Sequence, residues 1–317
     1  MVACVSIIVV SFNTKDQTLA CLQSIFEQTQ SLTFDVIVYD NASTDGSADA
    51  IARDFPQVNL IRGPENLGFG RANNAASNHA SGEYILLLNP DTIVLDNAVK
   101  RLFDFAVATP DAKIWGGRTV NLDGTLNPTC VWRFPTNWSM LSQALGLHRV
   151  FPTVAFFNPE PYPKWDRDTV RDVDIVTGCF LLTTKAFWHT LGGFDEDFFM
   201  YSEEADLCYR THKLGGRLVF TPAATIVHLD GATKQVASRK RCLLLAGRSE
   251  YIRKNWGPVS AALGRMILKL HVWVRLVGAT LLARRSGQTA SRSLWQEVWD
   301  QRRFWIKGFE GWEHRAK

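Results

Sequence analysis

The sequence lacks the short cysteine spacings that metal clusters and redox pairs require. Its six cysteines are scattered between Cys4 and Cys242, with no CxxC pair and no metal-ligand spacing. The expectation that follows is buried, reduced thiols in a cytosolic compartment. The chain also lacks a basic segment followed by an apolar run near Met1, so we expect no secretory signal.

A long uninterrupted hydrophobic run is absent as well. The most apolar window, residues 260–283, is broken by Arg265, Lys269, His271 and Arg275. Its uninterrupted runs fall short of the roughly 20 residues that a spanning helix needs. Wound as a helix, the window places its cations on two different sides, so it is not cleanly amphipathic. It predicts an interfacial helix, or a helix packed on the body of the protein or on a second subunit.

Acidic residues are scarce in the last part of the chain. Residues 234–317 hold 18 Lys and Arg against 5 Asp and Glu, a net charge of +13, whereas residues 1–233 hold 17 against 26, a net charge of −9. An acidic body with a basic C-terminal part predicts contact with nucleic acid or with an anionic membrane surface. The basic part contains Trp and Arg but no recognisable nucleic-acid-binding module, so we expect no nucleic-acid partner.

The composition is that of a folded protein. Of 317 residues, 46% are hydrophobic and 21% charged, which allows a sizeable core and argues against disorder. The length fits one large domain with an appendage, or two domains.

The first hundred residues alternate between strand-like and helix-like segments. Expected strands are 5–12, 34–40, 58–61 and 84–89, and expected helices are 14–28, 48–55 and 70–81. This alternation predicts a doubly wound α/β sheet, whose ligands bind at the carboxyl ends of the strands. Asn13, Asp40 and Asp91 follow strand ends and should therefore share one rim.

The pattern is less regular after that. A helix is expected over 94–108, then irregular structure with a mobile or substrate-facing loop to about residue 174, an apolar segment over 173–183, a helix over 206–214 and a strand over 217–227.

Two polar segments suit a nucleotide. Asp40 and Asp45 either accept hydrogen bonds from a ribose or a base, or merely cap the following helix. The glycines of the turn over 66–74 let backbone N–H groups approach a diphosphate, and Arg71 adds charge. The glycine order is not the GxGxxG fingerprint, and such turns are also common before ordinary helices.

The segment Asn89-Pro90-Asp91 ends a hydrophobic strand. Proline fixes a turn there, so Asp91 projects into the crevice at the strand ends. One or two carboxylates suffice for a divalent cation when a diphosphate supplies further oxygens; otherwise Asp91 is only a turn residue. His228 follows the strand over 217–227 and is either structural or a ligand.

An acidic cluster lies further along the chain. Residues 195–206 contain six Asp and Glu interleaved with aromatic residues. Neighbouring carboxylates and partial burial raise a carboxyl pKa, which suits a general base.

Together these motifs resemble the inverting glycosyltransferases of family 2, and within them the bacterial rhamnosyltransferase-like branch. The resemblance covers about residues 5–232 in the family's order, through segments 9–13, 38–47, 65–70, 88–91, 192–207 and 227–228. It implies a GT-A fold, a Rossmann-like doubly wound mixed sheet, for a catalytic domain over 1–232. A helical, basic region over 233–317 would contact a membrane surface or another subunit.

The resemblance also implies donor-site and metal roles. Asp40 would contact the pyrimidine base, with Asn13 and Asp45 near the nucleoside. Asp91 matches the last acidic residue of the DxD motif, which binds Mg²⁺ or Mn²⁺, and His228 resembles a second metal or diphosphate ligand. The other implied donor-binding residues are Ser11, Asn41, Asn66, Gly68, Arg71 and Asn89, the last standing where many relatives have the first Asp of that motif.

The catalytic base is implied by position. Glu204 matches the usual base, although relatives have Asp there, and the neighbouring Glu203 keeps the assignment open. Asp206 would orient the base or an acceptor hydroxyl.

The implied reaction is inverting transfer of a sugar to a glycan or a polyprenyl-diphosphate-linked acceptor at the inner face of the cell membrane. The sugar that the resemblance favours is L-rhamnose, from dTDP-rhamnose. Open alternatives are UDP-sugar donors for galactofuranosyl, glucosyl or N-acetylglucosaminyl transfer, and a non-catalytic nucleotide- or glycan-binding module. A homo-oligomer is also open. Tryptophans of the basic region, among them Trp273, suit an interface or a packed core.

Overall fold

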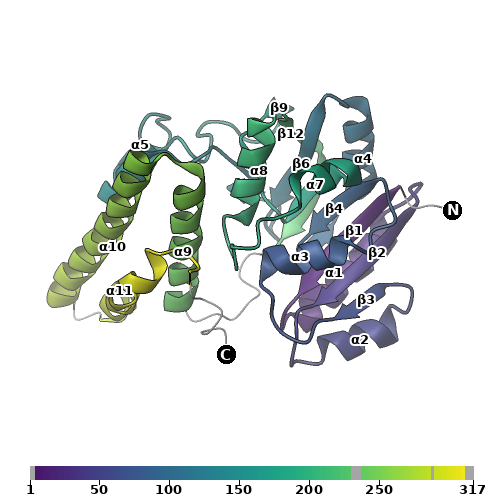
Figure 1. Ribbon diagram of the computed structural model, residues 1–317, viewed down its shortest axis with the longest axis horizontal. Helices are drawn as coiled ribbons and strands as arrows, with labels where there is room; N and C mark the ends of the chain where they lie inside the picture. Colours follow the sequence, from purple (N-terminus) through teal and green to yellow (C-terminus); the bar gives the residue numbers. More distant parts are fainter. Residues whose placement is uncertain (1–3, 230–236, 287–288, 311–317) are drawn as a thin grey trace. The chain divides into compact units, whose positions relative to one another are not determined.

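The computed structural model describes residues 4–229, 237–286 and 289–310 of the chain (Figure 1). These residues form two compact units. The first comprises 4–132, 165–196 and 204–229, and the second comprises 133–164, 197–203, 237–286 and 289–310. Two segments from before residue 232 therefore group with the C-terminal helices, and the domain boundary expected there stays a prediction.

The first unit is an α/β sheet. Its strands are β1 Val5–Ser11, β2 Phe34–Asp40, β3 Asn59–Arg62, β4 Tyr84–Leu88, β5 Thr92–Val94, β6 Ala112–Val120, β7 Leu126–Asn127, β8 Val131–Trp132, β9 Arg171–Asp172, β10 Ile175–Val176, β11 Phe180–Thr184 and β12 Arg217–His228. Its helices are α1 Lys15–Gln28, α2 Ser47–Asp54, α3 Phe69–Ser77, α4 Ala98–Ala108, α7 Lys185–Leu191, α8 Glu203–Lys213 and the 3-10 helix η1 Pro128–Cys130. The first residue of α8, Glu203, groups with the second unit.

The main sheet is mixed. Its path is β3-β2-β1-β4-β11-β6-β12-β5, with β7 beside β6 and β9 beside β12, while β8 and β10 form a separate pair. Strands β1 to β4 are mutually parallel where they pair, β11 is antiparallel to both β4 and β6, and β12 is parallel to β6. The predicted doubly wound mixed sheet is confirmed.

The core lies on both sides of the central strands. All seven residues of β1 are buried, as a continuous β-branched run predicts for a parallel strand covered on both faces. Helix α1 packs against β5, α3 against β1 and β2, and α4 against β6 and β12. The six cysteines are free, five of them buried and Cys4 half-buried.

Three sequence predictions need correction. The stretch predicted to be irregular contains β6, a nine-residue strand in the middle of the sheet. The helix expected from Val94 begins at Ala98, because residues 92–94 pair with β12 as β5. The same stretch, expected to hold a loop before about residue 174, also includes two helices, α5 Asn137–Leu145 and α6 Leu147–Val150.

Helix α5 begins at a capping box. Thr136 Oγ1 accepts a hydrogen bond from the Ser139 N–H at 3.0 Å, and Ser139 Oγ accepts one from the Thr136 N–H at 2.9 Å. This reciprocal pairing satisfies two N–H groups that a helix start leaves open. A local signal for α5 was thus present in the sequence.

The second unit is helical. Beside α5 and α6 it contains α9 Ala237–Asn255, α10 Pro258–Ser286, α11 Ala290–Asp300 and α12 Arg302–Trp305. Helix α10 packs against α5, α9 and α11. The buried Glu160 is satisfied there, since its carboxylate accepts hydrogen bonds from Ser139 Oγ at 2.6 Å and from Arg248 Nη2 at 3.1 Å. A buried carboxylate requires such partners.

Candidate functional site

The carboxyl ends of four strands bring the predicted site residues to one edge of the sheet. Ser11 at the end of β1 lies opposite Asp40 at the end of β2. On the other side of β1, Val9 lies opposite Leu88, the last residue of β4. Strand β12 is parallel to β6 and ends at His228. Open α/β sheets bind their ligands at this edge.

Asp91, His228 and Asn89 meet there. His228 Nε2 lies 3.4 Å from Asp91 Oδ1 and 3.5 Å from Asn89 Nδ2. The backbone joins them too, because the Leu229 N–H donates to the Asp91 carbonyl at 2.9 Å. Asp91 and His228, the two predicted metal ligands, are thus in direct contact although they are far apart in the sequence.

These groups fit a divalent cation that shares its coordination with a diphosphate. The Asn89 Oδ1 atom is buried and has no hydrogen-bond partner among the residues the structure describes. A carboxylate, an imidazole nitrogen and an amide oxygen suit Mg²⁺ or Mn²⁺. Within 4–229, 237–286 and 289–310 no three His, Cys, Asp or Glu side chains group as a complete metal site. The remaining ligands would be oxygens of the substrate and water.

Local bonds hold the turn that carries Asp91. The Asn89 carbonyl accepts a hydrogen bond from Thr92 Oγ1 at 2.7 Å, and the Asn89 N–H donates to the Cys179 carbonyl at 3.2 Å. The Cys21 Sγ atom lies 3.5 Å from Thr92 Oγ1. Burial raises the pKa of the Cys21 thiol to about 12, so it stays protonated and supplies no thiolate ligand.

Asp40 presents an open acceptor. Its side chain is buried, and its Oδ2 accepts a hydrogen bond from the Ser43 N–H at 3.1 Å. Its Oδ1 is also buried and has no hydrogen-bond partner among the described residues. Because an unpaired buried acceptor is costly, this oxygen is suited to a donor group of a ligand, such as a base N–H or a ribose hydroxyl.

Asn13 and Ser11 support that corner of the site. The Asn13 Oδ1 atom accepts a hydrogen bond from the Thr44 N–H at 2.8 Å, and its N–H donates to Ser43 Oγ at 3.0 Å. Asn13 has φ +52°, in the left-handed region that Asn tolerates better than most residues. Ser11 is buried, with its Oγ 3.0 Å from Thr18 Oγ1. Both side chains thus have structural partners, and their donor contacts stay predictions.

Asp45 binds backbone groups at two helix starts. Its carboxylate accepts hydrogen bonds from the Lys15 N–H at 2.9 Å and from the Ser47 N–H at 3.0 Å. Burial raises its pKa, but the hydrogen bonds from Ser47 and Lys15 outweigh burial and lower it overall. These contacts favour the capping interpretation.

Two amides build the glycine turn. Asn41 Nδ2 donates to Asn66 Oδ1 at 2.9 Å and to the Gly68 carbonyl at 3.0 Å, and Asn41 Oδ1 accepts from the Leu67 N–H at 2.8 Å. Gly68 has φ +82° immediately before α3, a conformation that favours glycine. The predicted donor residues Asn41, Asn66 and Gly68 are therefore together, and the two amides shape the turn.

Helix α3 also holds the segment in which the acidic cluster begins. Arg71 Nε donates to the Glu196 carbonyl at 2.8 Å. Asn74 Nδ2 donates to the Phe194 carbonyl at 2.8 Å, and Asn74 Oδ1 accepts from the Phe194 N–H at 2.9 Å. The role of Asn74 was not predicted from the sequence, where its one signal is the Asn73-Asn74 pair in the middle of α3.

The three acidic candidates differ in environment on α8. Glu203 is buried, whereas Glu204 is partly exposed. Asp206 is buried and paired with Arg210 Nε at 2.7 Å. The same guanidinium donates to the Gly193 carbonyl at 2.9 Å. Arg210, held by Asp206, thus ties α8 to the preceding loop. Glu204 is the more accessible carboxylate.

The backbone just before α8 is unusual. Tyr201 has φ +69° and Ser202 has φ +72°, two successive residues in a conformation that L-residues rarely adopt. Such strain clusters at functional sites. It supports a functional role for the helix start that holds Glu203 and Glu204.

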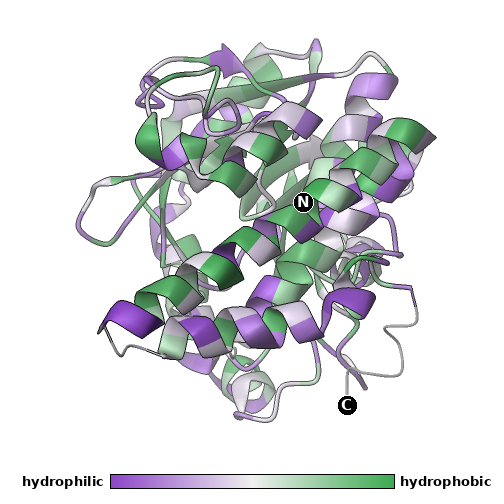
Figure 2. Ribbon diagram, turned by 90° about the vertical axis from the view of Figure 1, so that its left-hand side faces the viewer, coloured by the Kyte–Doolittle hydropathy of each residue, from purple (hydrophilic) through white to green (hydrophobic). Residues whose placement is uncertain are grey.

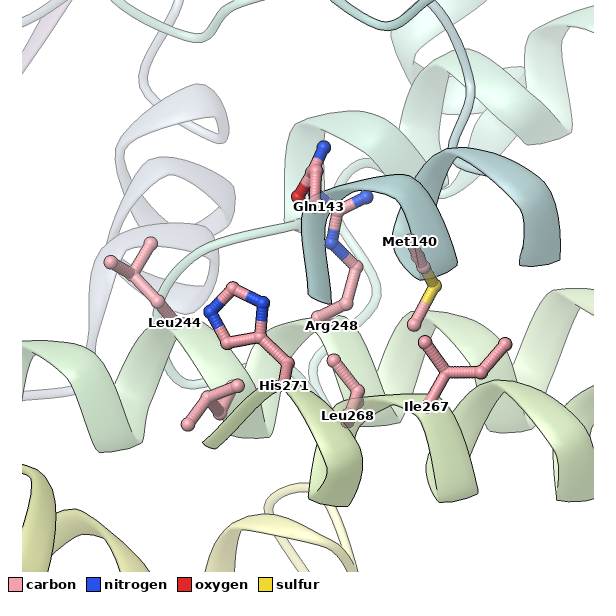
Figure 3. Close-up of a pocket in the computed structure, with 8 residues that line it drawn as sticks. Met140, Gln143, Leu244, Arg248, Ile267, Leu268 and His271 are labelled. Atoms are coloured by element: carbon pink, nitrogen blue, oxygen red, sulfur yellow. The ribbon is translucent and has the colours of Figure 1, made fainter. Parts of the chain in front are cut away.

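A cavity of about 130 Å³ lies in the second unit (Figure 3). Helices α5, α9 and α10 supply its lining, which consists of Met140, Gln143, Leu244, Leu245, Arg248, Ile267, Leu268 and His271. Burial and the nearby Arg275 lower the pKa of His271 to about 4. The cavity contains no carboxylate in its lining and none of the predicted site residues.

Comparison with known proteins shows which family the chain resembles. Residues 6–161 match the family model described as Glycosyl transferase family 2. The N-acetylglucosaminyl-diphospho-decaprenol L-rhamnosyltransferase of Mycobacterium tuberculosis (strain H37Rv) is 29% identical over 268 residues, 76% of this chain and 83% of that protein. The rhamnosyltransferase WbbL of Escherichia coli (strain K12) is 27% identical over 243 residues, 71% of this chain and 83% of WbbL.

A solved structure has the same fold. The mannosyltransferase PcManGT from Pyrobaculum calidifontis, in complex with GDP-Man and Mn²⁺, superposes with a TM-score of 0.57 at 18% identity, covering 99% of this chain and 88% of that one. This likeness establishes the GT-A fold that the resemblance implied. Residues 6–161 therefore match a glycosyltransferase domain of family 2, and the chain has the GT-A fold.

Proposed function

We propose that the protein is an inverting glycosyltransferase that moves L-rhamnose from dTDP-rhamnose to a hydroxyl of a glycan or lipid-linked acceptor in bacterial surface polysaccharide synthesis. The observation that supports sugar transfer best is the meeting of Asp91 with His228 at the sheet edge, where Asp40 also ends a strand. The choice of rhamnose rests on the names of the two relatives above.

The donor is proposed to lie along this edge. The open Oδ1 of Asp40 accepts a hydrogen bond from the pyrimidine base or ribose. The backbone at Gly68 and the start of α3 face the diphosphate, which a helix N-terminus favours. Asp91 and His228, with the Asn89 amide oxygen, would hold Mg²⁺ or Mn²⁺. When bound, the metal neutralises charge on the departing nucleoside diphosphate.

Glu204 is proposed as the general base. Its partly exposed carboxylate at the start of α8 takes the proton from the acceptor hydroxyl. The hydroxyl oxygen bonds to the anomeric carbon as the bond from that carbon to the diphosphate oxygen breaks. A single displacement of this kind inverts the anomeric configuration. Glu203 is the alternative base, and Asp206 positions the helix through Arg210.

The acceptor is proposed to be lipid-linked. The name of the mycobacterial relative states a diphospho-decaprenol acceptor. A net charge of +13 over residues 234–317 suits work at an anionic membrane, because each Lys or Arg near such a surface contributes about 1 kcal/mol. We therefore place the enzyme peripherally at the inner face of the cell membrane, with residues 1–232 catalytic and 233–317 as the attachment region.

A donor screen tests the proposal. Purified protein is mixed with UDP-, dTDP- and GDP-sugars, with Mg²⁺, Mn²⁺ or EDTA, and thermal unfolding is recorded. The proposal expects the largest stabilisation with dTDP-rhamnose and metal, since a ligand at 100 times its Kd adds about 2.7 kcal/mol. Preferential stabilisation by a UDP-sugar would replace rhamnose with another sugar. Stabilisation by none of them would refute sugar transfer.

A further inference from the structure

Helix α10 has a continuous hydrophobic stripe that other residues leave open to solvent. The stripe consists of Val259, Leu263, Met266, Leu270, Trp273, Val277 and Leu281. Their steps of three or four residues place them on one side of a helix. Val259 is 85% exposed, Met266 65% and Trp273 50%; of the seven, only Leu270 is half-buried. Figure 2 shows hydrophobic residues along much of this helix.

The opposite side of α10 is a packing surface. Leu268 and Val272 are buried there, with Ile267 buried on the flank, and α10 contacts α5 and α9. Arg275 Nη2 donates to the Gln143 carbonyl of α5 at 3.0 Å. The exposed stripe is therefore separate from the face of α10 that packs inside the second unit. The sequence had left the two sides of this helix undecided, and burial now assigns them.

We propose that this stripe is the surface on which the second unit docks onto an anionic lipid bilayer, with α10 lying in the plane of the interface. The inference deepens the proposed function, because it names the part of the chain that meets the membrane.

The charge on α10 favours a bilayer over a second copy of the chain. The helix contains Arg265, Lys269, Arg275, Arg284 and Arg285 and no Asp or Glu. Lys269, Arg284 and Arg285 are exposed. Two copies meeting along their stripes would bring these like charges together, whereas anionic headgroups would neutralise them. Hydrophobic side chains beside Lys and Arg are the pattern of an interfacial helix.

Length and composition alone would let α10 cross a membrane. Its contacts argue for an in-plane position instead. A spanning α10 would take Lys269 and Arg275 into the hydrocarbon, where charged side chains are costly. It would also have to give up the packing of Val272 and the hydrogen bond from Arg275 to α5. When α10 lies in the plane of the interface, it buries the stripe in the bilayer and keeps both the packing of Val272 and the Arg275 hydrogen bond.

Vesicle flotation with a charge-matched control tests the proposal. The test variant is Met266→Glu with Trp273→Glu. The control is Val107→Glu with Leu122→Glu, two exposed hydrophobic residues of the first unit. Both carry the same change in net charge. Wild type and control should float with vesicles of phosphatidylcholine and phosphatidylglycerol, more weakly with phosphatidylcholine alone. The test variant should bind about 100-fold more weakly, as expected for losing partial burial of two large side chains.

Four results would overturn the proposal. They are no flotation of wild type, equal flotation with neutral vesicles, wild-type flotation of the Met266→Glu, Trp273→Glu variant, and conversion of a dimer to a monomer by that variant in sedimentation. If the variant does not fold by circular dichroism, quenching by brominated lipids decides instead. Wild type should lose fluorescence that Trp273→Phe does not, and equal losses would refute docking.

Failure of docking and failure of sugar transfer give different results. The stripe variant should transfer sugar to a water-soluble acceptor at the wild-type rate and lose transfer only to an acceptor embedded in vesicles. Flotation of a wild-type protein that uses no donor would contradict the proposed function and leave docking intact. Transfer by a wild-type protein that does not float would overturn docking alone.

Discussion

The imidazole of His228 lies 3.4 Å, measured from its Nε2, from Oδ1 of Asp91. One residue follows strand β4 and the other ends strand β12, so the sheet alone brings them together. A carboxylate and an imidazole thus lie together at the carboxyl edge of the sheet, and these are the two side chains that we propose as metal ligands.

Removing either ligand should impair nucleotide binding only when metal is present. We expect Asp91→Asn and His228→Ala to weaken metal-dependent dTDP binding by about 100-fold, since groups behind the ligands already account for 10–100-fold in other metal sites. Titration calorimetry with Mn²⁺ and with EDTA measures this. Asp96→Asn, the same change on an exposed turn of the same unit, is the control. Unchanged dTDP affinity in Asp91→Asn would refute the metal assignment.

Substitution of the two glutamates that begin α8 should affect kcat differently. Glu204→Gln should lower kcat by about 10²–10⁴-fold, the usual contribution of a general base, while dTDP binding stays near the wild-type value. Glu203→Gln is the matched control, because it makes the same change one residue earlier on the same helix. If Glu203→Gln is the slower enzyme and Glu204→Gln is near wild type, the base is Glu203.

His271 should make the protein less stable in mild acid. Burial, followed by the charges of Arg275, His148, Arg149 and Arg248, lowers its pKa from 6.5 to about 4. The unfolded chain therefore binds a proton below about pH 6.5 that the folded chain binds only near pH 4. Stability should fall as the pH drops through this window, by on the order of 3 kcal/mol in total.

Denaturant titrations from pH 4 to 7 measure that loss. His271→Gln is the comparison, since it removes the titrating group and leaves a polar side chain at the cavity. The wild-type slope should exceed the slope of His271→Gln, and parallel curves would contradict the lowered pKa.

Two helical glycines should respond to alanine with opposite signs. A Cβ on Gly247 of α9 would come within 2.2 Å of the Tyr201 carbonyl oxygen, whereas a Cβ on Gly278 of α10 would meet nothing within 4 Å. Gly278→Ala should stabilise the protein by up to about 1 kcal/mol through helix propensity. Gly247→Ala should destabilise it by about 1–3 kcal/mol through overpacking. Thermal unfolding distinguishes them, and stabilisation of both would show that residues 197–203 do not pack closely on α9.

The local patterns in the sequence predicted the first four strands and their helices, because a buried β-branched run such as β1 needs no distant information. Strand β6 was missed because Gly116 and Gly117 interrupt its pattern. These glycines are there for packing, since a Cβ on Gly117 would lie 2.3 Å from the Phe180 ring. Strand β5 has only three residues and forms by pairing with β12, which periodicity cannot predict.

The site was predictable where a strand end determines a position. The rim residues Asp40 and Asp91 follow from topology. The contacts of the amide side chains do not follow from topology. The hydrogen bonds of Asn41 to Asn66 and of Asn74 to Phe194 join segments that meet only in the folded chain. The pairing of Asp206 with Arg210 is different, because it is a local pair four residues apart on α8 that the acidic run concealed.

The most direct measurement is transfer of radiolabelled rhamnose from dTDP-rhamnose to a lipid-linked N-acetylglucosaminyl diphosphate, by wild type and Asp91→Asn, with Mn²⁺ and with EDTA. We expect a labelled lipid product of inverted anomeric configuration from wild type with metal, and almost none with EDTA or from Asp91→Asn. Equal product formation in all four conditions, or none from wild type with any donor, would contradict this expectation.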